Sequence, residues 1–351
     1  MTPLMARQML MPLTMAFRPT GLGRATSARL SVATDRTLMV VDGHAIAYRM
    51  HFALVSTGLS TLDGEPTHAL SAFCSKMLDL HSRFERPNIV VAWDLPGGAA
   101  LRTAELPSYK ASRPAMPMAL RTQIIAMRDW CEVMGVPALT AEGYEADDII
   151  ATCVAAARAR GAPSVVVVTP DKDMLQLVSD GGTPGPTTVS VWNDAKKVPA
   201  AAKGKGKGAK GLLFDAAAVM DQYGVRPSQM GDLLALMGDA SDNIPGVPGV
   251  GPKIAAKLLV EYGDLEGVLA AALTMKQSKR QAALIEHTDV ARRARRLVAL
   301  CEDVPLDPHL TCGAPLRTQM SDEARAFLER WELRRTASAI ETLEREHPTA
   351  Q

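Results

Sequence analysis

Cysteine is sparse in this sequence and forms no recognisable pattern. The chain has 351 residues and five cysteines, with no CxxC motif and no Cys/His spacing typical of a metal site. The sequence therefore indicates neither a zinc site nor a disulfide framework, and a reducing compartment fits this usage. The five positions are Cys74, Cys131, Cys153, Cys301 and Cys312.

Long apolar runs are also missing. No segment offers the roughly 18 uninterrupted apolar residues of a transmembrane helix, so no membrane span and no membrane partner are predicted. The hydrophobic content of 47% still allows a substantial core. A chain of this length exceeds the size at which a single core stops growing, so we expect one large domain and a smaller one. The net charge of +1 excludes little, because nearly balanced charges can still be segregated into patches.

Acidic residues are absent before Asp35. The N-terminal segment is rich in Arg, Ser, Thr and Met, and prolines interrupt its short apolar runs. A basic, hydroxylated and acid-poor start is typical of an organelle transit peptide, so residues 1–36 are predicted to direct the protein to a chloroplast or a mitochondrion. A disordered tail and a misassigned start codon are the alternatives.

Short valine-rich runs alternate with helical segments after Thr37. Continuous apolar runs are typical of strands buried on both faces, and their alternation with helices predicts a parallel arrangement. The predicted fold class is therefore α/β, with a mostly parallel sheet flanked by helices. The predicted strands are 37–41, 89–93 and 165–168, with a shorter run at 136–140, and the predicted helices are 66–84, 117–134 and the segment after Tyr144.

Three predicted strands run into an aspartate: Asp42, Asp94 and Asp171. Ligand sites of open α/β sheets lie outside the carboxyl ends of the strands, so parallel neighbours would bring these carboxylates to one crevice. A single aspartate at such a place is often only a turn or helix-capping residue. Three in one chain indicate a site.

The helix after Tyr144 and the loop after the third strand add Glu145, Asp147, Asp148 and Asp173. Clustered carboxylates repel one another, which raises their pKa values unless cations are present, so a cation site is predicted. Glu145 and Asp147 flank the apolar stripe of the helix, whereas Asp148 points nearly away from it. Alternatively, these acids only favour the positive end of the helix dipole and cap its N–H groups.

Six motifs follow one another along the chain: VDGHAIAYR (41–49), AWD (92–94), YKASR (109–113), GYEADD (143–148), TPDKD (169–173) and GDASDNIPGVPGVGPKIAAKLL (238–259). In order and spacing they resemble the 5′-nuclease domain of bacterial family A DNA polymerases and the wider flap-endonuclease family. The resemblance covers nearly all of the chain from Thr37 to about Pro305. It implies a PIN-like nuclease core (37–212) with an arch (96–117), then a helix-hairpin-helix DNA-binding subdomain (213–305). A helical tail (306–351) follows.

The resemblance also implies that nine acids hold two divalent metal ions. Hard oxygen ligands select Mg²⁺ or Mn²⁺ over zinc, so two Mg²⁺ ions are expected, with Mn²⁺ able to substitute. Mg²⁺ keeps several waters, which explains how many carboxylates serve few direct bonds. Two ions about 4 Å apart would activate a water for in-line attack on a phosphodiester, without a nucleophilic side chain. The acids are Asp42, Asp94, Glu145, Asp147, Asp148, Asp171, Asp173, Asp239 and Asp242.

The arch would lie above the crevice. By resemblance, Lys110 and Arg113 contact the scissile phosphate as catalytic residues, and Arg49 contacts DNA. Tyr109 offers a face for base stacking. Taken without the motif, Lys110 and Arg113 would be read as a solvated charged loop.

A glycine-rich loop precedes a predicted helix that starts at Pro252. Backbone N–H groups of such a loop and of the helix start can cradle a phosphate, and glycines permit close approach. This segment resembles a helix-hairpin-helix that grips duplex DNA without reading its sequence. The predicted DNA contacts are Gly246, Gly249, Gly251, Lys253 and Lys257.

Three further segments have a biased charge. Residues 194–211 are a Lys/Gly-rich insertion, predicted to be a flexible surface spacer that could attract phosphates. Residues 277–300 form a strongly basic helical stretch that faces either the duplex or solvent. Residues 322–346 alternate acids and arginines as a surface helix does.

The predicted function is a metal-dependent 5′→3′ exonuclease and 5′-flap endonuclease that removes primers or flaps from DNA. The expected partners are DNA with 5′ ends, flaps or nicks, RNA–DNA hybrid primers, and a DNA polymerase on a separate chain, because no polymerase motif follows. We expect a monomer. The alternatives are a catalytically silent, structure-specific DNA-binding protein, and a ribonuclease on the same scaffold.

Overall fold

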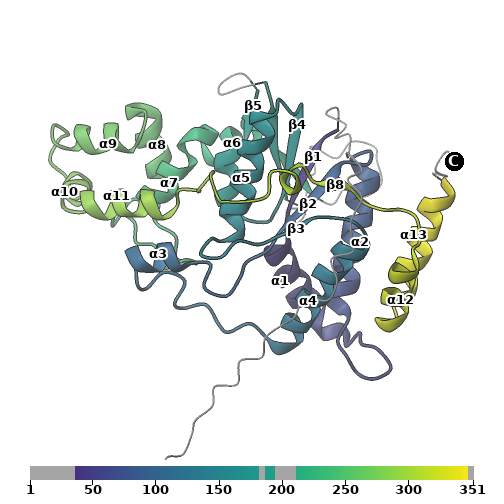
Figure 1. Cartoon of the computed structure of the whole chain (residues 1–351). Helices are drawn as coiled ribbons and strands as arrows, with labels where there is room; N and C mark the ends of the chain where they lie inside the picture. Colours follow the sequence, from purple (N-terminus) through teal and green to yellow (C-terminus); the bar gives the residue numbers. More distant parts are fainter. Residues whose placement is uncertain (1–35, 182–185, 194–210, 347–351) are drawn as a thin grey trace, which may run out of the picture. The chain divides into compact units, whose positions relative to one another are not determined.

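A mostly parallel sheet forms the centre of the fold, as predicted (Figure 1). Its strand order is β3-β2-β1-β4-β6-β5, and the pairs among β3, β2, β1, β4 and β6 are parallel. The short strands β5, β7 and β8 pair antiparallel. The strands are β1 (Leu38–Asp42), β2 (Asn88–Ala92), β3 (Ala138–Leu139), β4 (Ser164–Val168), β5 (Ser179–Asp180), β6 (Thr188–Asn193), β7 (Leu212–Phe214) and β8 (Ala314–Pro315).

The computed structural model describes residues 36–181, 186–193 and 211–346. The predicted transit peptide and the basic insertion lie outside these residues, except for Arg36 and Gly211 at their edges. The described residues belong to one compact unit that begins at Thr34. Within the described ranges, no helix is both long enough and apolar enough to cross a membrane.

Both faces of the sheet are buried, because alternate strand residues enter two separate apolar clusters. Val40 and Val90 pack on the face covered by α5 (Ala146–Ala159). Met39 and Val91 pack on the opposite face. Burial on both sides explains why these strands are continuously apolar. The opposite face is covered by α1 (Gly43–Leu54), α2 (His68–Arg83) and α4 (Met118–Val133), of which α2 and α4 match the predicted helices.

A group of short helices follows the sheet in the chain. α7 contacts both α8 and α11, and α9 contacts α8 and α10 (Figure 1). The buried apolar residues of these helices continue the cluster that lies between α5 and the sheet. α8 begins at Pro252, as predicted. The basic stretch is two helices separated by His287, and not a single helix. The group comprises α6 (Ala216–Tyr223), α7 (Met230–Met237), α8 (Pro252–Tyr262), α9 (Leu265–Ala272), α10 (Lys279–Glu286) and α11 (Thr288–Leu297).

The C-terminal segment differs from the surface helix that its charges predicted. It forms two helices, α12 (Asp322–Arg330) and α13 (Arg334–Glu346), which contact α4 and α2 respectively. Leu328, Trp331 and Ile340 are buried there. The alternating charges occupy the outer faces, and the few apolar positions between them hold the pair against the nuclease core.

Candidate metal centre and nucleic-acid interface

The strand-end aspartates lie at one edge of the sheet. β2, β1 and β4 are parallel neighbours, and Asp42 pairs in register with Ala92, two residues before Asp94. Asp42 caps α1, since its Oδ1 accepts a hydrogen bond from Ala45 N at 2.9 Å. The Oδ1 atom of Asp94 accepts one from Ala146 N at 2.7 Å, at the start of α5. These aspartates therefore cap helix starts, as the alternative interpretation held, and they also converge on one crevice.

Thr169 links the ends of β1 and β4. Its hydroxyl donates to Oδ2 of Asp42 at 2.7 Å and accepts a hydrogen bond from Asp171 N at 3.0 Å. The next carboxylate is fixed in turn, because Asp173 N donates to Oδ1 of Asp171 at 2.9 Å. The turn after β4 therefore holds its acids in a defined position.

Four carboxylates, those of Asp42, Asp94, Asp147 and Asp171, line one cleft of about 540 Å³. Aromatic side chains of α1 form part of its wall: the rings of His44 and Tyr48 are 6.1 Å apart, and those of Tyr48 and Phe52 are 6.2 Å apart. Sequence reasoning missed this wall, although a spacing of four residues on a helix signals a shared face. The other lining residues are Ala45, Lys110, Arg113, Pro114, Ala115, Met116, Pro117 and Ala146.

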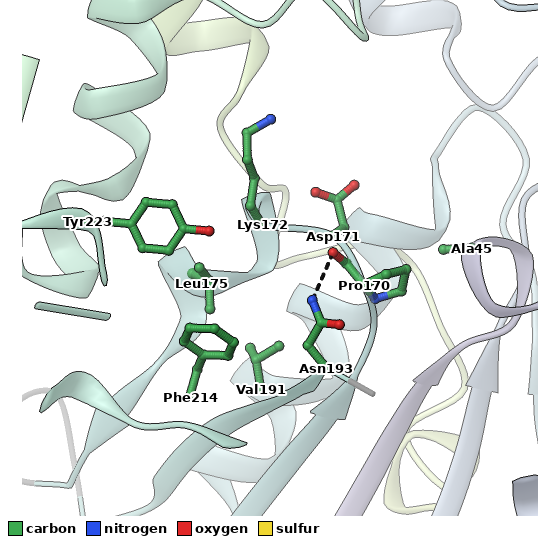
Figure 2. A pocket seen from close by; sticks show the side chains of 9 residues that line it. All are labelled: Ala45, Pro170, Asp171, Lys172, Leu175, Val191, Asn193, Phe214 and Tyr223. Carbon is green, nitrogen blue, oxygen red and sulfur yellow. Dashed lines mark hydrogen bonds between the residues drawn. The ribbon is translucent and has the colours of Figure 1, made fainter. Parts of the chain in front are cut away.

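A second cleft, of about 430 Å³, lies beside Asp171 (Figure 2). Ala45 and Asp171 line both clefts, so they meet at the turn after β4. Its floor is apolar, and the polar groups of Lys172 and Tyr223 stand above it in Figure 2. It is lined by Ala45, Pro170, Asp171, Lys172, Leu175, Val191, Asn193, Phe214 and Tyr223.

Burial raises the pKa values of three acids in this region. For Asp42, burial together with the charges of Asp94 and Asp171 raises the pKa to about 7, against hydrogen bonds that lower it. For Asp173, burial and Asp171 likewise raise the pKa to about 7. The pKa of Asp147 is raised well above 3.8 by burial and by the charges of Asp171 and Asp42. Mutual repulsion of this kind is relieved by a bound cation.

The residues present fit divalent cations that keep part of their water shell. Oδ1 of Asp173 is buried and accepts no hydrogen bond from any described residue, and its nearest cation is Lys172 Nζ at 3.9 Å. Within residues 36–181, 186–193 and 211–346, no three Asp, Glu, His or Cys side chains are placed to ligate one ion directly. Mg²⁺ uses few direct protein bonds and retains waters, so carboxylate oxygens spread along a cleft of this size suit it.

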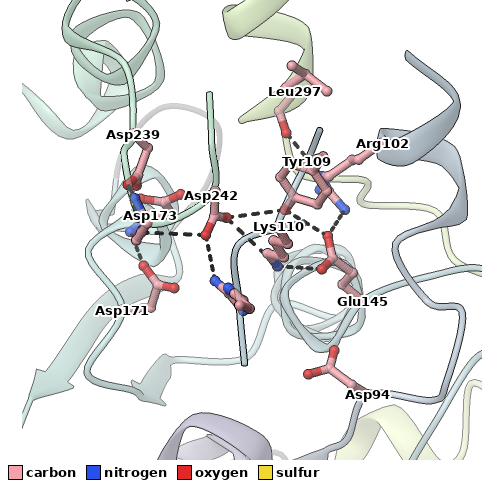
Figure 3. A network of polar contacts seen from close by, with 12 residues as sticks. Asp94, Arg102, Tyr109, Lys110, Glu145, Asp171, Asp173, Asp239, Asp242 and Leu297 are labelled. Carbon is pink, nitrogen blue, oxygen red and sulfur yellow. Dashed lines mark hydrogen bonds and ion pairs between the residues drawn. The ribbon is translucent and has the colours of Figure 1, made fainter. Parts of the chain in front are cut away.

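Glu145 is surrounded by donors from the arch (Figure 3). Its Oε2 accepts from Arg102 Nη1 at 2.9 Å and lies 3.0 Å from the Tyr109 hydroxyl. Its Oε1 pairs with Lys110 Nζ. Burial alone would lower the pKa of Lys110, but the charges of Glu145, Asp147 and Asp242 raise it, so this side chain stays charged. Glu145 therefore holds the arch at the edge of the acidic cluster.

Asp148 turns away from the cluster, as its helical position predicted. Both of its oxygens accept hydrogen bonds from Arg102, at 2.7 and 2.8 Å, and its Oδ1 also accepts from Cys301 N at 3.0 Å. Its Oδ2 accepts from Glu145 N and completes a capping box. The structure thus places Asp148, a predicted metal ligand, in an ion pair beneath the start of α5. Arg102 was not singled out in the sequence, where a lone arginine between Leu101 and Thr103 gives no signal.

A closed loop carries Asp239 and Asp242. Backbone hydrogen bonds between Asp239 and Ile244 close it, at 2.8 and 2.9 Å. Burial alone would raise the pKa of Asp239, but hydrogen bonds from Lys172 and Ser241 lower it. The Lys172 Nζ to Asp239 Oδ2 distance is 2.6 Å. Figure 3 shows these acids close to Asp171 and Asp173, so the predicted meeting of early and late motifs is present.

The arch contains one short helix, α3 (Ala100–Glu105), and otherwise turns and loop over residues 96–117. Lys110 has a φ of 54°, a left-handed value that side chains rarely adopt. Its N–H donates to Asp242 O at 3.0 Å, and Arg113 Nη2 donates to Asp242 Oδ1 at 2.5 Å. The two predicted catalytic cations therefore lie over the acids.

Tyr109 is placed differently from the expectation of a stacking face. It is 6% exposed, and its hydroxyl lies between Glu145 Oε2 and Asp242 Oδ2, the latter at 3.3 Å. Burial of the ring and the polar contacts of its hydroxyl make it part of the arch base. The exposed aromatic side chain at this cleft is Phe52, with an exposure of 64%.

The glycine-rich loop has two different structural requirements. A Cβ on Gly246 would lie 2.3 Å from the carbonyl carbon of Met237, so only glycine fits against the end of α7. Gly249 has a φ of 77°, which favours glycine. Gly251, the N-cap of α8, has no atom near its would-be Cβ, which leaves the helix start approachable.

The remaining predicted DNA contacts are basic. Lys253 and Lys257 are exposed on α8, beside the glycine loop, whereas Arg49 is half-buried on α1. On α11, three of the four arginines pair with acids: Arg292 with Glu266, Arg295 with Asp232 and Arg296 with Glu105. Most of the charge of this helix is therefore used within the protein.

Two family models match this chain. One, described as "5′-3′ exonuclease, N-terminal resolvase-like domain", matches residues 37–224, and the other, "5′-3′ exonuclease, C-terminal SAM fold", matches residues 225–322. DNA polymerase I of Rhizobium leguminosarum is 35% identical over 329 residues, 91% of this chain and 30% of the relative. DNA polymerase I of Chloroflexus aurantiacus is 36% identical over 270 residues, 77% of this chain and 27% of the relative. The chain thus spans less than a third of these relatives.

Solved structures share the fold. T5 5′-exonuclease with divalent metal ions (zinc) bound has a TM-score of 0.59 at 22% identity, over 87% of this chain and 100% of that one. The catalytic core of Rad2 in complex with a DNA substrate has a TM-score of 0.55 at 15% identity, over 89% and 93%. At these identities the likeness shows the architecture, which agrees with the predicted nuclease core and helical subdomain.

Proposed function

This chain belongs to the 5′-3′ exonuclease family, and we propose that it hydrolyses phosphodiester bonds near the 5′ ends of DNA as a two-metal 5′→3′ exonuclease and flap endonuclease. One observation carries the proposal. Asp42, Asp94, Asp147 and Asp171 line a single cleft over which Lys110 and Arg113 lie. Helix capping accounts for one oxygen of Asp42 and one of Asp94, but not for four carboxylates gathered in one cleft beneath two cations. Such a group of carboxylates suits a cation-bridged phosphodiester.

The proposed metal is Mg²⁺, with Mn²⁺ as a substitute, because every candidate ligand is a hard oxygen. Two bound ions would supply an activated water and stabilise charge on the entering and leaving oxygens. Asp42, Asp94, Asp147 and Asp171 would hold one side of this centre. Asp173, Asp239 and Asp242 would hold the other side. Glu145 borders the centre and Asp148 supports it from below, since both of its oxygens are bonded to Arg102.

The arch cations bind and orient the substrate in this proposal. Lys110 Nζ is 3.8 Å from Asp242 Oδ2 and also pairs with Glu145, so it lies between the two sides of the acidic cluster. Arg113 is 51% exposed and can present a guanidinium to a phosphate that enters the cleft. A guanidinium binds two phosphate oxygens at once, which fixes the orientation of the scissile group.

Duplex DNA is the proposed partner of the glycine loop and α8. The N–H groups at the start of α8, with Lys253 and Lys257 beside them, form a phosphate site that reads no sequence. T5 flap endonuclease has been solved in a complex with DNA and metal ions, and the Rad2 core with a DNA substrate, which supports the same class of partner here. A ribonuclease or a silent DNA-binding protein would not need both features together.

One gel experiment tests the function. Purified protein is incubated with labelled 5′-flap, nicked, RNA-primed and single-stranded substrates, with Mg²⁺, Mn²⁺ or EDTA. We expect cleavage of the flap and nicked substrates that requires the divalent ion. Binding without cleavage in Mg²⁺ would indicate the silent DNA-binding alternative, and preferred cutting of RNA would indicate the ribonuclease.

The cellular setting is a separate proposal. We propose that residues 1–36 direct the protein to an organelle, where it acts as a monomer beside a DNA polymerase whose strand displacement produces the flaps. The basic, acid-poor composition of these residues supports the first part. A fluorescent protein fused after residue 36 should enter chloroplasts or mitochondria, and diffuse fluorescence would contradict the proposal. Removal of the segment should leave nuclease activity unchanged.

A further inference from the structure

Arg102 uses every N–H group of its guanidinium. Nε donates to Leu297 O at 3.0 Å, and Nη2 donates to Ala299 O at 3.0 Å and to Asp148 Oδ1 at 2.8 Å. Nη1 donates to Asp148 Oδ2 at 2.7 Å and to Glu145 Oε2 at 2.9 Å. An arginine has five such donors in a fixed plane, so its position is fully determined by these partners.

The partners of Arg102 come from parts of the chain that are far apart in sequence. Arg102 itself lies on α3, at the first root of the arch. Glu145 and Asp148 lie at the start of α5, which carries Asp147. Leu297 is the last residue of α11, which packs on α7, and Ala299 follows two residues later. A single side chain thus joins the arch, the acidic helix and the helical subdomain.

Glu145 links Arg102 to a second part of the arch, at Tyr109 and Lys110. Its carboxylate bonds to Arg102 on one side and to Tyr109 and Lys110 on the other (Figure 3). Tyr109 also reaches Asp242. Loss of Arg102 would leave the Glu145 carboxylate with only Tyr109 and Lys110 as side-chain donors, so Glu145 and Lys110 could move together.

Lysine could not replace this arginine. The side chains of Glu145 and Asp148 are only 8% and 3% exposed, so both carboxylates need close charge compensation. An ammonium group could pair with one or both acids, but it has no planar fork that also reaches the carbonyls of Leu297 and Ala299. The site is built for a guanidinium.

We propose that Arg102 is a positioning residue for the nuclease reaction: it holds Glu145, and through it Lys110, in register with Asp147 and Asp242. The inference rests on the proposed function for its kinetic effect, although its structural part does not. It assigns to Asp148 the role of anchoring Arg102.

The test compares four variants of the full chain. Arg102→Gln removes the charge and most of the donors, and Arg102→Lys keeps only the charge. The double variant Arg102→Gln with Asp148→Asn also removes the buried charge that Arg102 neutralises. Arg296→Gln is the matched control, because Arg296 pairs with Glu105 across the same α3–α11 junction at 2.7 Å but does not touch Glu145.

Single-turnover flap cleavage in Mg²⁺, flap affinity in Ca²⁺ and melting temperature are measured for each variant. Loss of a residue that orients a metal-site group costs roughly 10- to 100-fold, so we expect the single-turnover rate constant of Arg102→Gln to fall by that factor. Its affinity for flap DNA should stay within about threefold of the wild type. Arg102→Lys should fall between Arg102→Gln and the wild type, and Arg296→Gln should match the wild type.

The double variant separates positioning from stability. We expect the double variant to regain most of the decrease in melting temperature caused by Arg102→Gln, but not the decrease in single-turnover rate constant. Recovery of the rate constant together with the melting temperature would overturn the proposal. A variant Arg102→Gln that binds flap DNA more weakly but cleaves bound DNA at the wild-type rate would also overturn it.

Hydrogen exchange of the amides of residues 109–113 is the second readout, and it requires no catalysis. These amides should exchange faster in Arg102→Gln and in the double variant than in Arg296→Gln. If the wild type cleaves no substrate, the proposed function fails, and this exchange result alone decides whether Arg102 positions the arch. Equal exchange in all variants would overturn the inference.

Discussion

The acidic residues form two groups that differ in their neighbours. Among the described residues, Glu145, Asp148, Asp239 and Asp242 each have an arginine or lysine nitrogen within 2.9 Å. Asp42, Asp94, Asp147, Asp171 and Asp173 have no arginine or lysine that close within the described ranges. The first group is closely charge-compensated. We call the second group uncompensated, because its only lysine or arginine contact among the described residues is the longer one of 3.9 Å between Asp173 and Lys172.

Local cations, and not residue type, separate the two groups. The pKa of Asp239, in the compensated group, is lowered by Lys172 and Ser241 despite its burial. The pKa values of Asp42 and Asp173, in the uncompensated group, are raised to about 7. Aspartates from neighbouring motifs thus divide into acids that pair closely with an arginine or lysine of the protein and acids that do not.

Among substitutions in the uncompensated group, Asp171→Asn should have the largest effect on cleavage. Asp171 lines both clefts and has no cation partner among the described residues. A metal contact contributes several kcal/mol, so cleavage should fall on the order of 1,000-fold in a single-turnover assay. Duplex binding in Ca²⁺ should be kept. Asp264→Asn is the control, because Asp264 only caps α9; undiminished cleavage by Asp171→Asn in Mg²⁺ would refute the metal assignment.

Adjacent residues Asp147 and Asp148 allow the two groups to be compared at one helix start. Asp148→Asn removes one partner of a buried ion pair, so the free energy of unfolding should fall by about 3 kcal/mol or more. Asp147→Asn should cost no stability in EDTA, because it removes an acid whose burial already raises its pKa. It should instead abolish most cleavage.

Urea unfolding and flap cleavage measure these two outcomes. The expected result is a double dissociation, in which one variant loses stability and its neighbour loses activity. If Asp147→Asn were the destabilised variant and Asp148→Asn stayed stable but inactive, the division into compensated and uncompensated acids would be wrong.

Solution pH should affect the two groups differently. Asp42 and Asp173 have pKa values of about 7 in the folded protein against 3.8 ordinarily, so the folded state binds more protons between these values. Stability from these groups is present below pH 3.8 and is lost as pH rises through about 7. In EDTA, the melting temperature should therefore fall by about 3 °C or more between pH 5 and pH 8.

Addition of Mg²⁺ should reverse this loss. A cation that binds the ionised acids stabilises the folded state more at pH 8 than at pH 5. Differential scanning fluorimetry at both pH values, with and without Mg²⁺, measures the effect. Asp171→Asn should reduce the stabilisation by Mg²⁺; equal stabilisation by Mg²⁺ at both pH values would contradict the assigned pKa shifts.

The smallest expected effect concerns the phosphate grip of the glycine loop and α8. Lys253→Gln with Lys257→Gln should weaken duplex binding about tenfold or less, and the slope of its salt dependence should fall by about one for each phosphate that is no longer neutralised. Cleavage at saturating DNA should not change. Lys76→Gln on α2 is the control. A loss of kcat at saturation would show that α8 acts on the chemistry as well as on binding.

The sequence predicted the architecture well because repeated short-range patterns encode it. Strands buried on both faces give continuous valine runs, and their parallel order brings Asp42, Asp94 and Asp171 to one edge. The position of Asp148 followed from helical spacing alone. These features depend on neighbours only a few residues away.

Other features depend on partners that the sequence does not reveal. Arg102 donates hydrogen bonds to the carbonyls of Leu297 and Ala299, which lie almost 200 residues later in the chain. The sequence around Arg102 does not indicate these partners. Tyr109 was expected to be open for stacking, but its ring is part of the buried apolar cluster and its hydroxyl contacts Glu145 and Asp242. In the tail, a few apolar residues among many charges were enough to pack two helices on the core. Long-range packing decided each case.

The closed loop from Asp239 to Ile244 has a geometric consequence. Its acids lie close to Asp171 and Asp173 (Figure 3), and two residues after its end Gly246 is wedged against α7 before the phosphate-gripping loop. Because no flexible linker separates these parts, the grip and the acids are a fixed distance apart. In the proposed reaction, this fixed distance would set the position of the cut. The cut would lie at a constant number of nucleotides from the gripped duplex, whatever the length of the flap.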